Sequence, residues 1–357
     1  MESRESSRIP VAVLGGTGYV AAELLRLIAR HPSLAIGAVV SREHAGLAVL
    51  DAFPHLRGVL PDGLTFRAFE DWRADGSAGA VAGLFLALPH GETSRVVADL
   101  FHSGEPEGLC IVDVSADFRF PDPARFERIY GVPHAARDLA KRFVSLVPEQ
   151  AGDEPCRFAA QPGCFATAVT LAAWPFARMQ LIEGPVFASA VTGSSGSGRK
   201  PRETTHHPAR RSDLFAYSPL AHRHEPEMRR LIGYPDSREW EVEFVAHSGP
   251  MVRGIHATVR MTLREPTAAA ELVDRVNAFY GARGPFVRAS IAMPHLTSVV
   301  GTNRCDLGVA VRGRTLVVTS VLDNLIKGAA GGAVQWMNRC LGLPPDSGLR
   351  LDGLGWF

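Results

Sequence analysis

The sequence predicts a two-domain α/β protein in which a domain built on a parallel sheet precedes a second, strand-rich domain. Three observations support this fold class. The first 40 residues have the pattern strand, glycine-rich turn, helix, strand, and further apolar runs with polar tips continue to about residue 160. Beyond Cys164 several segments alternate apolar and polar residues, as half-buried strands do. A chain of 357 residues is also long for a single domain.

The N-terminal pattern is typical of a dinucleotide-binding half-domain. Residues 11–14 are a short apolar strand, 15–21 (GGTGYVA) form the turn, a helix with one apolar face ends near His31, and residues 34–40 are a second strand. The glycines let main-chain N–H groups approach a pyrophosphate at the helix N-terminus. A lone G-x-x-G-x-x-A is a weak signal, because many strand-to-helix turns are glycine-rich. Its place between a strand and a helix favours the dinucleotide.

The tip of the second strand indicates which dinucleotide is bound. A site for NAD usually places Asp or Glu here to accept from the ribose hydroxyls. This chain has Ser41 and Arg42, whose hydroxyl and guanidinium suit a 2′-phosphate. A solvated loop arginine is the alternative. The position favours NADP(H).

Two further buried strands, at residues 80–88 and 109–114, end in polar segments. The first ends at Pro89-His90-Gly91, and the second runs into residues 113–119 (DVSADFR). Ligands bind at such carboxyl ends in open parallel sheets.

The remaining elements are expected as follows. The pattern predicts a helix at residues 164–182 that is interrupted by Pro175. It also predicts a helix at 271–280 and a final helix of small residues at 326–338. A strand at 186–191 leads into the glycine loop 193–199. Antiparallel strands are expected at 241–245, 254–263 and 315–322.

Cys164 is the first chemical candidate. It follows Pro162-Gly163 and begins a helical run, where the helix dipole favours an anion, so its thiol ionises more readily than a free one. A buried small residue at a turn is the alternative for a lone cysteine.

The cluster His222-Arg223-His224, followed by acids, is the second candidate. Histidine can act as acid and base near neutral pH, and arginine can hold a carboxylate or phosphate. Cys, His and NADP(H) together imply one chemistry: a thiolate takes an acyl group from an activated carbonyl, hydride reduces the thioester to an aldehyde, and His moves protons.

Composition narrows the class of protein. Lys+Arg is 38 and Asp+Glu is 37, and the net charge of +1 argues against a dedicated nucleic-acid binder. Residues 1–10 are charged and polar, unlike a signal peptide, and apolar runs stay below the ~18 residues that span a bilayer. The five cysteines contain no C-x-x-C pair, so we expect neither a disulfide framework nor a metal site. We expect a cytoplasmic protein.

With these motifs in order, the chain resembles the N-acetyl-γ-glutamyl-phosphate reductase family over essentially its full length. The matching segments are 15–19 with Glu23, 41–42, 88–91, 113–119, 162–164, 193–199, 222–227 and 323–328. The resemblance implies a Rossmann NADP-binding domain (1–162), an α+β catalytic and oligomerisation domain of the semialdehyde dehydrogenase type (163–325), and a C-terminal helix and tail (326–357) returning to the first domain. It also implies a homodimer or homotetramer.

Carried over residue by residue, the resemblance makes Cys164 the nucleophile and His222 the acid/base, with His224 second. The residues implied for the cofactor are Gly15, Thr17, Gly18, Tyr19, Ser41, Arg42, Pro89, His90, Ser195, Gly196 and Asn324. Those implied for the substrate are Ser115, Arg119, Arg199, Arg223 and Glu227. Two departures are Ala21, where a third glycine is frequent, and Phe165, where Tyr is usual.

The acyl chain stays open between two substrates. One is N-acetyl-γ-glutamyl phosphate, in arginine biosynthesis. The other is the substrate of the lysine-pathway branch, an aminoadipyl (or glutamyl) phosphate linked to an acidic carrier protein. The segments 204–210 and 251–255 resemble that branch, and the basic run 199–211 suits an acidic partner, although a charge run is usually a solvated face.

Two other functional hypotheses compete with an acyl-phosphate reductase. Aspartate-semialdehyde dehydrogenase is the nearest enzyme, and the segment 222–227 argues against it. A non-catalytic Rossmann protein that senses the NADP(H) redox state, with a structural Cys164, is the alternative from another class.

Overall fold

The computed structural model describes residues 8–102, 104–236, 238–353 and 355. The chain forms two compact units. The first contains Met1–Ser145, Asp153–Gln161 and Ala333–Leu349, and the second contains Leu146–Gly152, Pro162–Gly332 and Arg350–Phe357. Compared with the expected ranges, the short segments 146–152, 326–332 and 350–357 belong to the second unit and not to the first. Part of the charged N-terminal segment, residues 1–7, lies outside the described residues.

The first unit is built on a six-stranded sheet with the order β3-β2-β1-β4-β5-β6. All of its strand pairs are parallel. The strands are β1 (Ile9–Leu14), β2 (Leu34–Val40), β3 (Phe66–Arg67), β4 (Gly83–Leu86), β5 (Cys110–Asp113) and β6 (Phe158–Ala160). The strand order reverses between β1 and β4, which is the place where open parallel sheets bind ligands.

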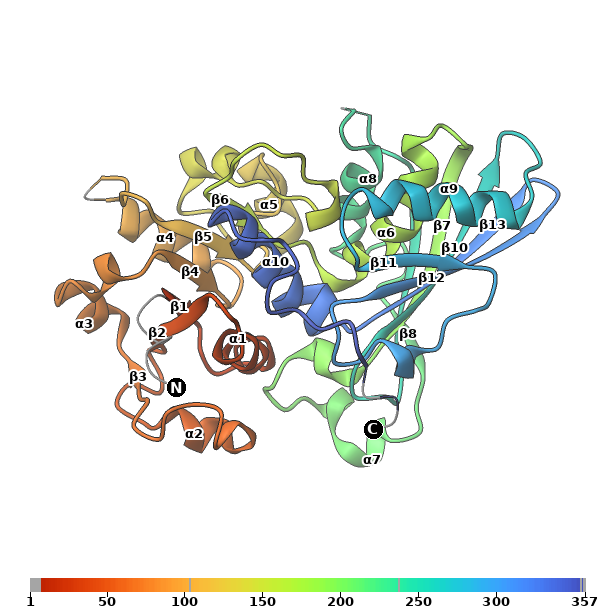
Figure 1. Cartoon of the computed structure of the whole chain (residues 1–357). Helices are drawn as coiled ribbons and strands as arrows, with labels where there is room; N and C mark the ends of the chain where they lie inside the picture. The colour runs from red at the N-terminus through yellow and green to blue at the C-terminus, as the bar shows by residue number, and fades with distance from the viewer. Residues whose placement is uncertain (1–7, 103, 237, 354, 356–357) are drawn as a thin grey trace, which may run out of the picture. The chain divides into compact units, whose positions relative to one another are not determined.

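The helices of this unit are short, and Figure 1 labels them along the chain. They are α1 (Tyr19–Ala29), α2 (Val49–Ala52), α3 (Phe69–Ala74), α4 (Glu92–Phe101) and α5 (Pro123–Tyr130), with 3₁₀ turns at Pro54–Leu56, Ser77–Ala80 and Arg137–Arg142. The last helix, α10 (Gly331–Cys340), belongs to this unit from Ala333 onward. It packs on β4 so closely that a Cβ on Gly83 would lie 2.6 Å from the Met337 sulfur.

The second unit contains a seven-stranded sheet with the order β11-β12-β13-β10-β7-β9-β8. The strands are β7 (Ile182–Thr192), β8 (Phe215–Tyr217), β9 (Val242–Ser248), β10 (Ile255–Leu263), β11 (Val287–Ser290), β12 (Cys305–Arg312) and β13 (Thr315–Leu322). The expectation of antiparallel pairing is wrong for β9, which runs parallel to β7. A second parallel pair joins β11 and β12, for which no strand was expected. The long connection from β7 to β9 contains a helix, and such a crossover allows parallel pairing.

Among its described residues the second unit has four α-helices, and α6, α8 and α9 pack against the sheet (Figure 1). They are α6 (Cys164–Arg178), α7 (His207–Arg210), α8 (Glu225–Gly233) and α9 (Ala269–Gly281). 3₁₀ turns lie at Pro148–Gln150, Ser194–Ser197, Glu203–Thr205 and Leu296–Ser298, and the expected final helix begins as a π-helical turn, Ile326–Ala330.

The predicted interruption at Pro175 is wrong, because α6 continues through it to Arg178. Proline cannot donate to the carbonyl four residues earlier, which here belongs to Leu171. The Tyr280 hydroxyl of α9 donates to this carbonyl at 2.7 Å. Every residue from Phe165 to Phe176 is also buried, so tertiary packing offsets the cost of the proline.

Across the described ranges, none of the helices combines the length and the apolar character that a membrane crossing requires.

Candidate active site

Cys164 is the first residue of α6 and is partly exposed. The N-cap residue, Gly163, is extended (φ −60°, ψ 152°), and its main-chain N–H donates to Glu227 Oε2 at 2.8 Å. Glu227 lies on α8 and is 1% exposed. The thiol therefore stands at the positive end of a 15-residue helix whose entry is fixed by a buried carboxylate.

Gly163 and Gly328 lie beside the thiol, and close contacts at both positions leave no room for a side chain. A Cβ on Gly163 would lie 2.4 Å from His224 Nε2, so the imidazole rests directly on the residue before Cys164. A Cβ on Gly328, in the π-helical turn, would lie 2.7 Å from the Cβ of Cys164. The nucleophile candidate is thus held between α8 and the turn 326–330.

His222 occupies an aromatic enclosure. Its ring makes edge contacts with Phe165, Tyr217 and Phe244 at centroid distances of 5.4, 5.5 and 5.4 Å. Burial, and then the charge of Arg223, lower the pKa of His222 to about 4. Its Nδ1 accepts the main-chain N–H of His224 at 3.1 Å, which leaves the proton of the neutral ring on Nε2.

Tyr217 is a site residue that the sequence did not indicate. Burial, and then the charge of Cys164, raise the pKa of its hydroxyl, so it stays protonated as a donor near neutral pH. It lies on β8, a strand of three residues with no recognisable pattern. Only the fold brings it to the cysteine and the histidines.

The loop 193–198 is bound to two other segments of the second unit. Ser194 N and Ser195 N donate to the carbonyls of Met251 and Val252, and Asn324 joins both segments. The Asn324 side chain accepts from Gly254 N at 2.6 Å and donates to Ser195 Oγ at 3.1 Å. The structure therefore brings together Ser195, Gly196 and Asn324, which were expected at the cofactor.

The dinucleotide candidates form a separate group, in the first unit. Gly15 has φ +85°, and a Cβ on it would lie 2.5 Å from the Ala87 carbonyl oxygen, so only glycine fits. Gly18 is the N-cap of α1, and within the described part of the chain no side chain caps this helix. A Cβ on Gly18 would meet no described atom within 4 Å. This cradle fits a pyrophosphate at the helix N-terminus, with Thr17 in the turn and Tyr19 40% exposed beside it.

Ser41 and Arg42 follow β2, as expected. Ser41 is buried and its N–H donates to the Arg67 carbonyl at 3.0 Å, whereas Arg42 is exposed and pairs with Glu70 at 3.1 Å. Arg42 is thus free of the core and is held near the strand tip by a surface carboxylate.

The tips of β4 and β5 are joined by Asp117. Its carboxylate accepts from Gly91 N and Ser94 N, at the start of α4, and from the Ser115 hydroxyl. Burial, and then the charge of Asp117, raise the pKa of Asp113 to about 7. Pro89 and His90 are exposed, and the His90 ring contacts Tyr130.

The candidate substrate residues are placed differently from one another. Arg199 and Arg223 are exposed in the second unit. Arg119 is buried, and its Nε and Nη2 donate to the carbonyls of Gln161 and Val114. Glu227, expected at the substrate, accepts the main-chain N–H of Gly163.

Comparison with known proteins agrees with this architecture. Residues 10–143 match the family model "Semialdehyde dehydrogenase, NAD binding domain", and residues 164–324 match "Semialdehyde dehydrogenase, dimerisation domain". The crystal structure of aspartate semialdehyde dehydrogenase II from Vibrio cholerae superposes with a TM-score of 0.68 over 94% of this chain and 99% of that one. At 16% identity this likeness shows the fold alone.

Curated relatives are much more similar in sequence. The N-acetyl-gamma-glutamyl-phosphate reductase of Methanopyrus kandleri is 38% identical over 97% of this chain and 99% of its own length. That of Rhodospirillum rubrum is 38% identical over 96% and 98%. The predicted fold class and the nicotinamide-binding domain are confirmed, and the chain belongs to the N-acetyl-γ-glutamyl-phosphate reductase family.

Proposed function

We propose that the protein catalyses the NADPH-dependent reduction of N-acetyl-γ-glutamyl phosphate to the semialdehyde, with release of phosphate, in arginine biosynthesis. The observation that carries this proposal is the placement of Cys164 at the start of α6, with His224 on the preceding residue and His222 and Tyr217 beside it. The names of the curated relatives support the acetylated glutamyl substrate.

Cys164 performs the covalent step. Its thiolate, favoured by the α6 N-terminus, attacks the acyl carbon, and the phosphate leaves with the bond electrons to give a thioester. The nicotinamide cofactor, when bound, supplies the hydride that reduces the acyl group. The thiolate of Cys164 is then expelled as the aldehyde forms. NADP(H) is held through Gly15, Gly18 and Arg42 of the first unit.

Between the histidines, we propose His224 as the acid/base. A general acid/base works best with a pKa near the operating pH, and burial has lowered the pKa of His222 to about 4. His224 rests on Gly163, next to the nucleophile, whereas His222 holds the His224 main chain and offers Nε2–H. The family resemblance made His222 the first candidate for the acid/base and His224 the second, and our proposal reverses this order.

We assign the anionic groups of the substrate to Arg199 and Arg223, because both are exposed near the glycine loop and the histidine cluster in sequence. Arg119 already donates to two main-chain oxygens and ranks below them.

The test is phosphate-dependent oxidation of N-acetylglutamate semialdehyde by NADP. Cys164→Ser should lose most of this activity and still bind NADP, and His224→Asn should flatten the neutral limb of the pH–rate profile more than His222→Asn does. Turnover near the wild-type level in Cys164→Ser contradicts the thioester. If iodoacetamide labels Cys164 slowly and there is no activity to lose, the hypothesis of a non-catalytic redox sensor replaces the proposed reductase.

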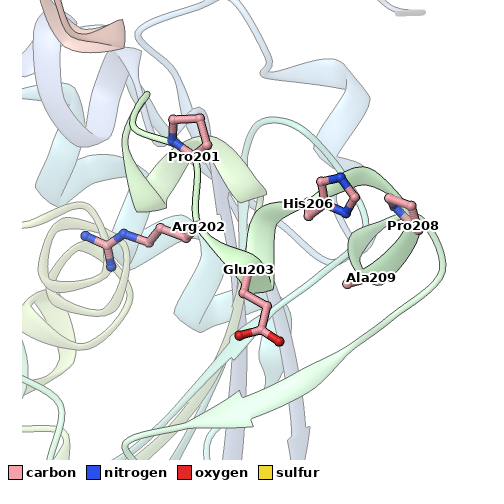
Figure 2. Close-up of a pocket in the computed structure, with 6 residues that line it drawn as sticks. All are labelled: Pro201, Arg202, Glu203, His206, Pro208 and Ala209. Carbon is pink, nitrogen blue, oxygen red and sulfur yellow. The ribbon is translucent and has the colours of Figure 1, made fainter.

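A carrier-linked acyl phosphate is the second candidate, and the exposed basic loop favours it. Residues 199–209 are exposed apart from the half-buried Thr205, and they form a surface hollow (Figure 2) lined by Pro201, Arg202, Glu203, His206, Pro208 and Ala209. An acidic carrier protein would dock here through charge complementarity. Arg210 is 5% exposed and donates to the carbonyls of Asp213 and Ser248, so it belongs to the core and not to the docking set.

A side-by-side assay of free and carrier-linked substrates separates the two. Neutralising Arg202 and Arg211 should weaken only the carrier-linked reaction. An equal loss with the acetylated substrate contradicts docking.

The second unit carries a dimerisation domain, and we propose that the uncovered face of its sheet forms the homodimer contact. Phe187 of β7 is 38% exposed and pairs with Arg260 of β10 across the strands, and Ser189 and Thr258 follow on the same face. Phe187→Asp should shift the protein toward monomer in light scattering, and an unchanged mass contradicts this interface.

A further inference from the structure

Three cysteines that the proposed reaction does not use meet in the first unit. Cys110 begins β5, Cys156 precedes the residue that pairs with β5, and Cys340 is the last residue of α10. The Cys156 and Cys340 sulfurs are 3.3 Å apart, although 184 residues separate them in the chain. The Cys110 thiol donates to the Cys340 carbonyl oxygen at 3.3 Å.

We propose that Cys156 and Cys340 form a redox-sensitive dithiol that a peroxide closes to a disulfide. The two sulfurs need to approach by about 1.3 Å to reach the bond length of a disulfide. Both residues are partly exposed, so a small oxidant can reach them. Cys110 is 3% exposed and lies against a carbonyl, so it is not the partner.

The surroundings decide which thiol reacts first. The S–H of Cys340 lowers the pKa of Cys156, burial opposes this, and the charge of Arg339 adds a smaller lowering, so Cys156 is the better thiolate. Hydrogen bonds to Cys110 and Cys156 raise the pKa of Cys340. Cys156 therefore attacks and Cys340 resolves.

The chemistry balances in two steps. The Cys156 thiolate attacks one oxygen of hydrogen peroxide, the O–O bond breaks, and a sulfenic acid and hydroxide form. Cys340, as its thiolate, attacks the sulfenic sulfur, the S–O bond breaks, and hydroxide leaves. The two hydroxides take the two thiol protons, so two thiols and one peroxide give one disulfide and two waters. A dithiol reductant reverses the bond by exchange.

Closure would fasten the end of α10 to the sheet. The Ile111 N–H donates to the Arg157 carbonyl, next to Cys156, at 2.8 Å, so this position is fixed to β5. Met337, three residues before Cys340, packs on β4. A cross-link over so long a stretch of chain removes much entropy from the unfolded state. In a compartment that keeps thiols reduced, the pair stays open until oxidants accumulate.

The experiment uses the full chain with Cys164→Ser, so that the reactive thiol at α6 does not consume the oxidant; four of the five cysteines then remain. After hydrogen peroxide treatment we expect two titratable thiols to be lost and a peptide mass map to show Cys156 joined to Cys340. The melting temperature should rise by about 5 °C or more, reversibly with dithiothreitol. The same map on the unsubstituted protein guards against a folding defect of the variant.

Matched variants separate the pair from its neighbour. Cys110→Ser should still close the bond, whereas Cys156→Ser and Cys340→Ser should each abolish it together with the rise in melting temperature. A linkage through Cys110, a linkage between two chains, or four thiols still titratable after oxidation each overturns the proposal. None of these readouts depends on turnover.

Discussion

Glu227 accepts the main-chain N–H of Gly163 at 2.8 Å, so a buried carboxylate on α8 fixes the residue that precedes Cys164. A charge-assisted hydrogen bond of this kind contributes about 1.5–3 kcal/mol. The contact connects the segment His222–Glu227 to the start of α6. The two motifs therefore act as one site.

Removing this contact should lower turnover more than substrate affinity. Glu227→Ala frees the entry of α6, and misplacement of a reacting group by about 1 Å costs on the order of 10²-fold. We expect kcat to fall at least tenfold with a small change in KM. Glu227→Gln keeps an acceptor oxygen and should retain more activity, and Glu225→Ala on the same helix is the matched control. An equal loss in the Gln and Ala variants contradicts a positioning role.

Gly328 should tolerate no side chain, because its Cβ would lie 2.7 Å from the Cβ of Cys164 and 3.1 Å from its Cα. Gly328→Ala must displace either the π-helical turn or Cys164. We expect kcat and the rate of Cys164 alkylation to fall together, by about 10²-fold for kcat. Gly281→Ala, where a Cβ meets no described atom within 4 Å, is the control. Wild-type alkylation in Gly328→Ala shows that the contact relaxes without consequence.

The enclosure of His222 should make stability depend on pH. Its folded-state pKa of about 4 lies below the ordinary 6.5, so the unfolded state binds more protons between these values. The free energy of unfolding therefore keeps its full value above pH 6.5 with respect to His222, and it decreases as the pH falls toward 4. At pH 5 the loss is about 2 kcal/mol.

Replacing His222 should remove this dependence. In urea unfolding at pH 7.5 and pH 5, the difference in apparent free energy should shrink by about 2 kcal/mol in His222→Gln. His55→Gln is the control, because it removes an exposed histidine and leaves the buried histidines, including His222, in place. An unchanged difference in His222→Gln rules out the titration of this ring as the cause.

The sequence predicted those parts of the fold that depend on local pattern. β2 was predicted to the residue, because a continuous apolar run between turn residues is what a buried parallel strand needs. The start of α6 at Cys164 followed from Pro162-Gly163. The parallel pairing of β9 with β7 could not be predicted, since strand direction depends on where a long connection returns.

Other features depend on contacts between distant residues. Pro175 indicates a break, and only Tyr280, 109 residues from Leu171 in the chain, shows why the helix continues. Tyr217 reaches the site through three-dimensional proximity alone. Arg210 belonged to a basic run in the sequence, and its burial removes it from the exposed surface. A run of charged residues in the sequence predicts a charged surface segment. Packing then determines which of these side chains are exposed.

The ion pair of Arg42 and Glu70 should modulate cofactor choice. Both side chains are exposed, and Glu70 would compete with the 2′-phosphate of NADPH for the guanidinium. Arg42→Ala should raise KM for NADPH by about tenfold and leave KM for NADH unchanged. Glu70→Gln should lower KM for NADPH by up to about fivefold, because a surface pair is worth up to about 1 kcal/mol. Asp71→Asn on the same helix is the control. Equal effects on both cofactors remove the assignment of Arg42.

Lys327 and Glu149 form an ion pair inside the second unit, with side chains 0% and 2% exposed, directly before Gly328. Breaking a buried pair leaves an uncompensated charge and costs about 3–5 kcal/mol, whereas replacing both partners can be neutral. Lys327→Met and Glu149→Gln should therefore each lower the midpoint of urea unfolding, and the double variant should recover most of the loss. Arg275→Ala, which breaks the exposed pair with Glu271 on α9, should cost less than about 1 kcal/mol. If the two single losses simply add in the double variant, the charges do not stabilise one another, and the turn that carries Gly328 is held by its apolar packing instead.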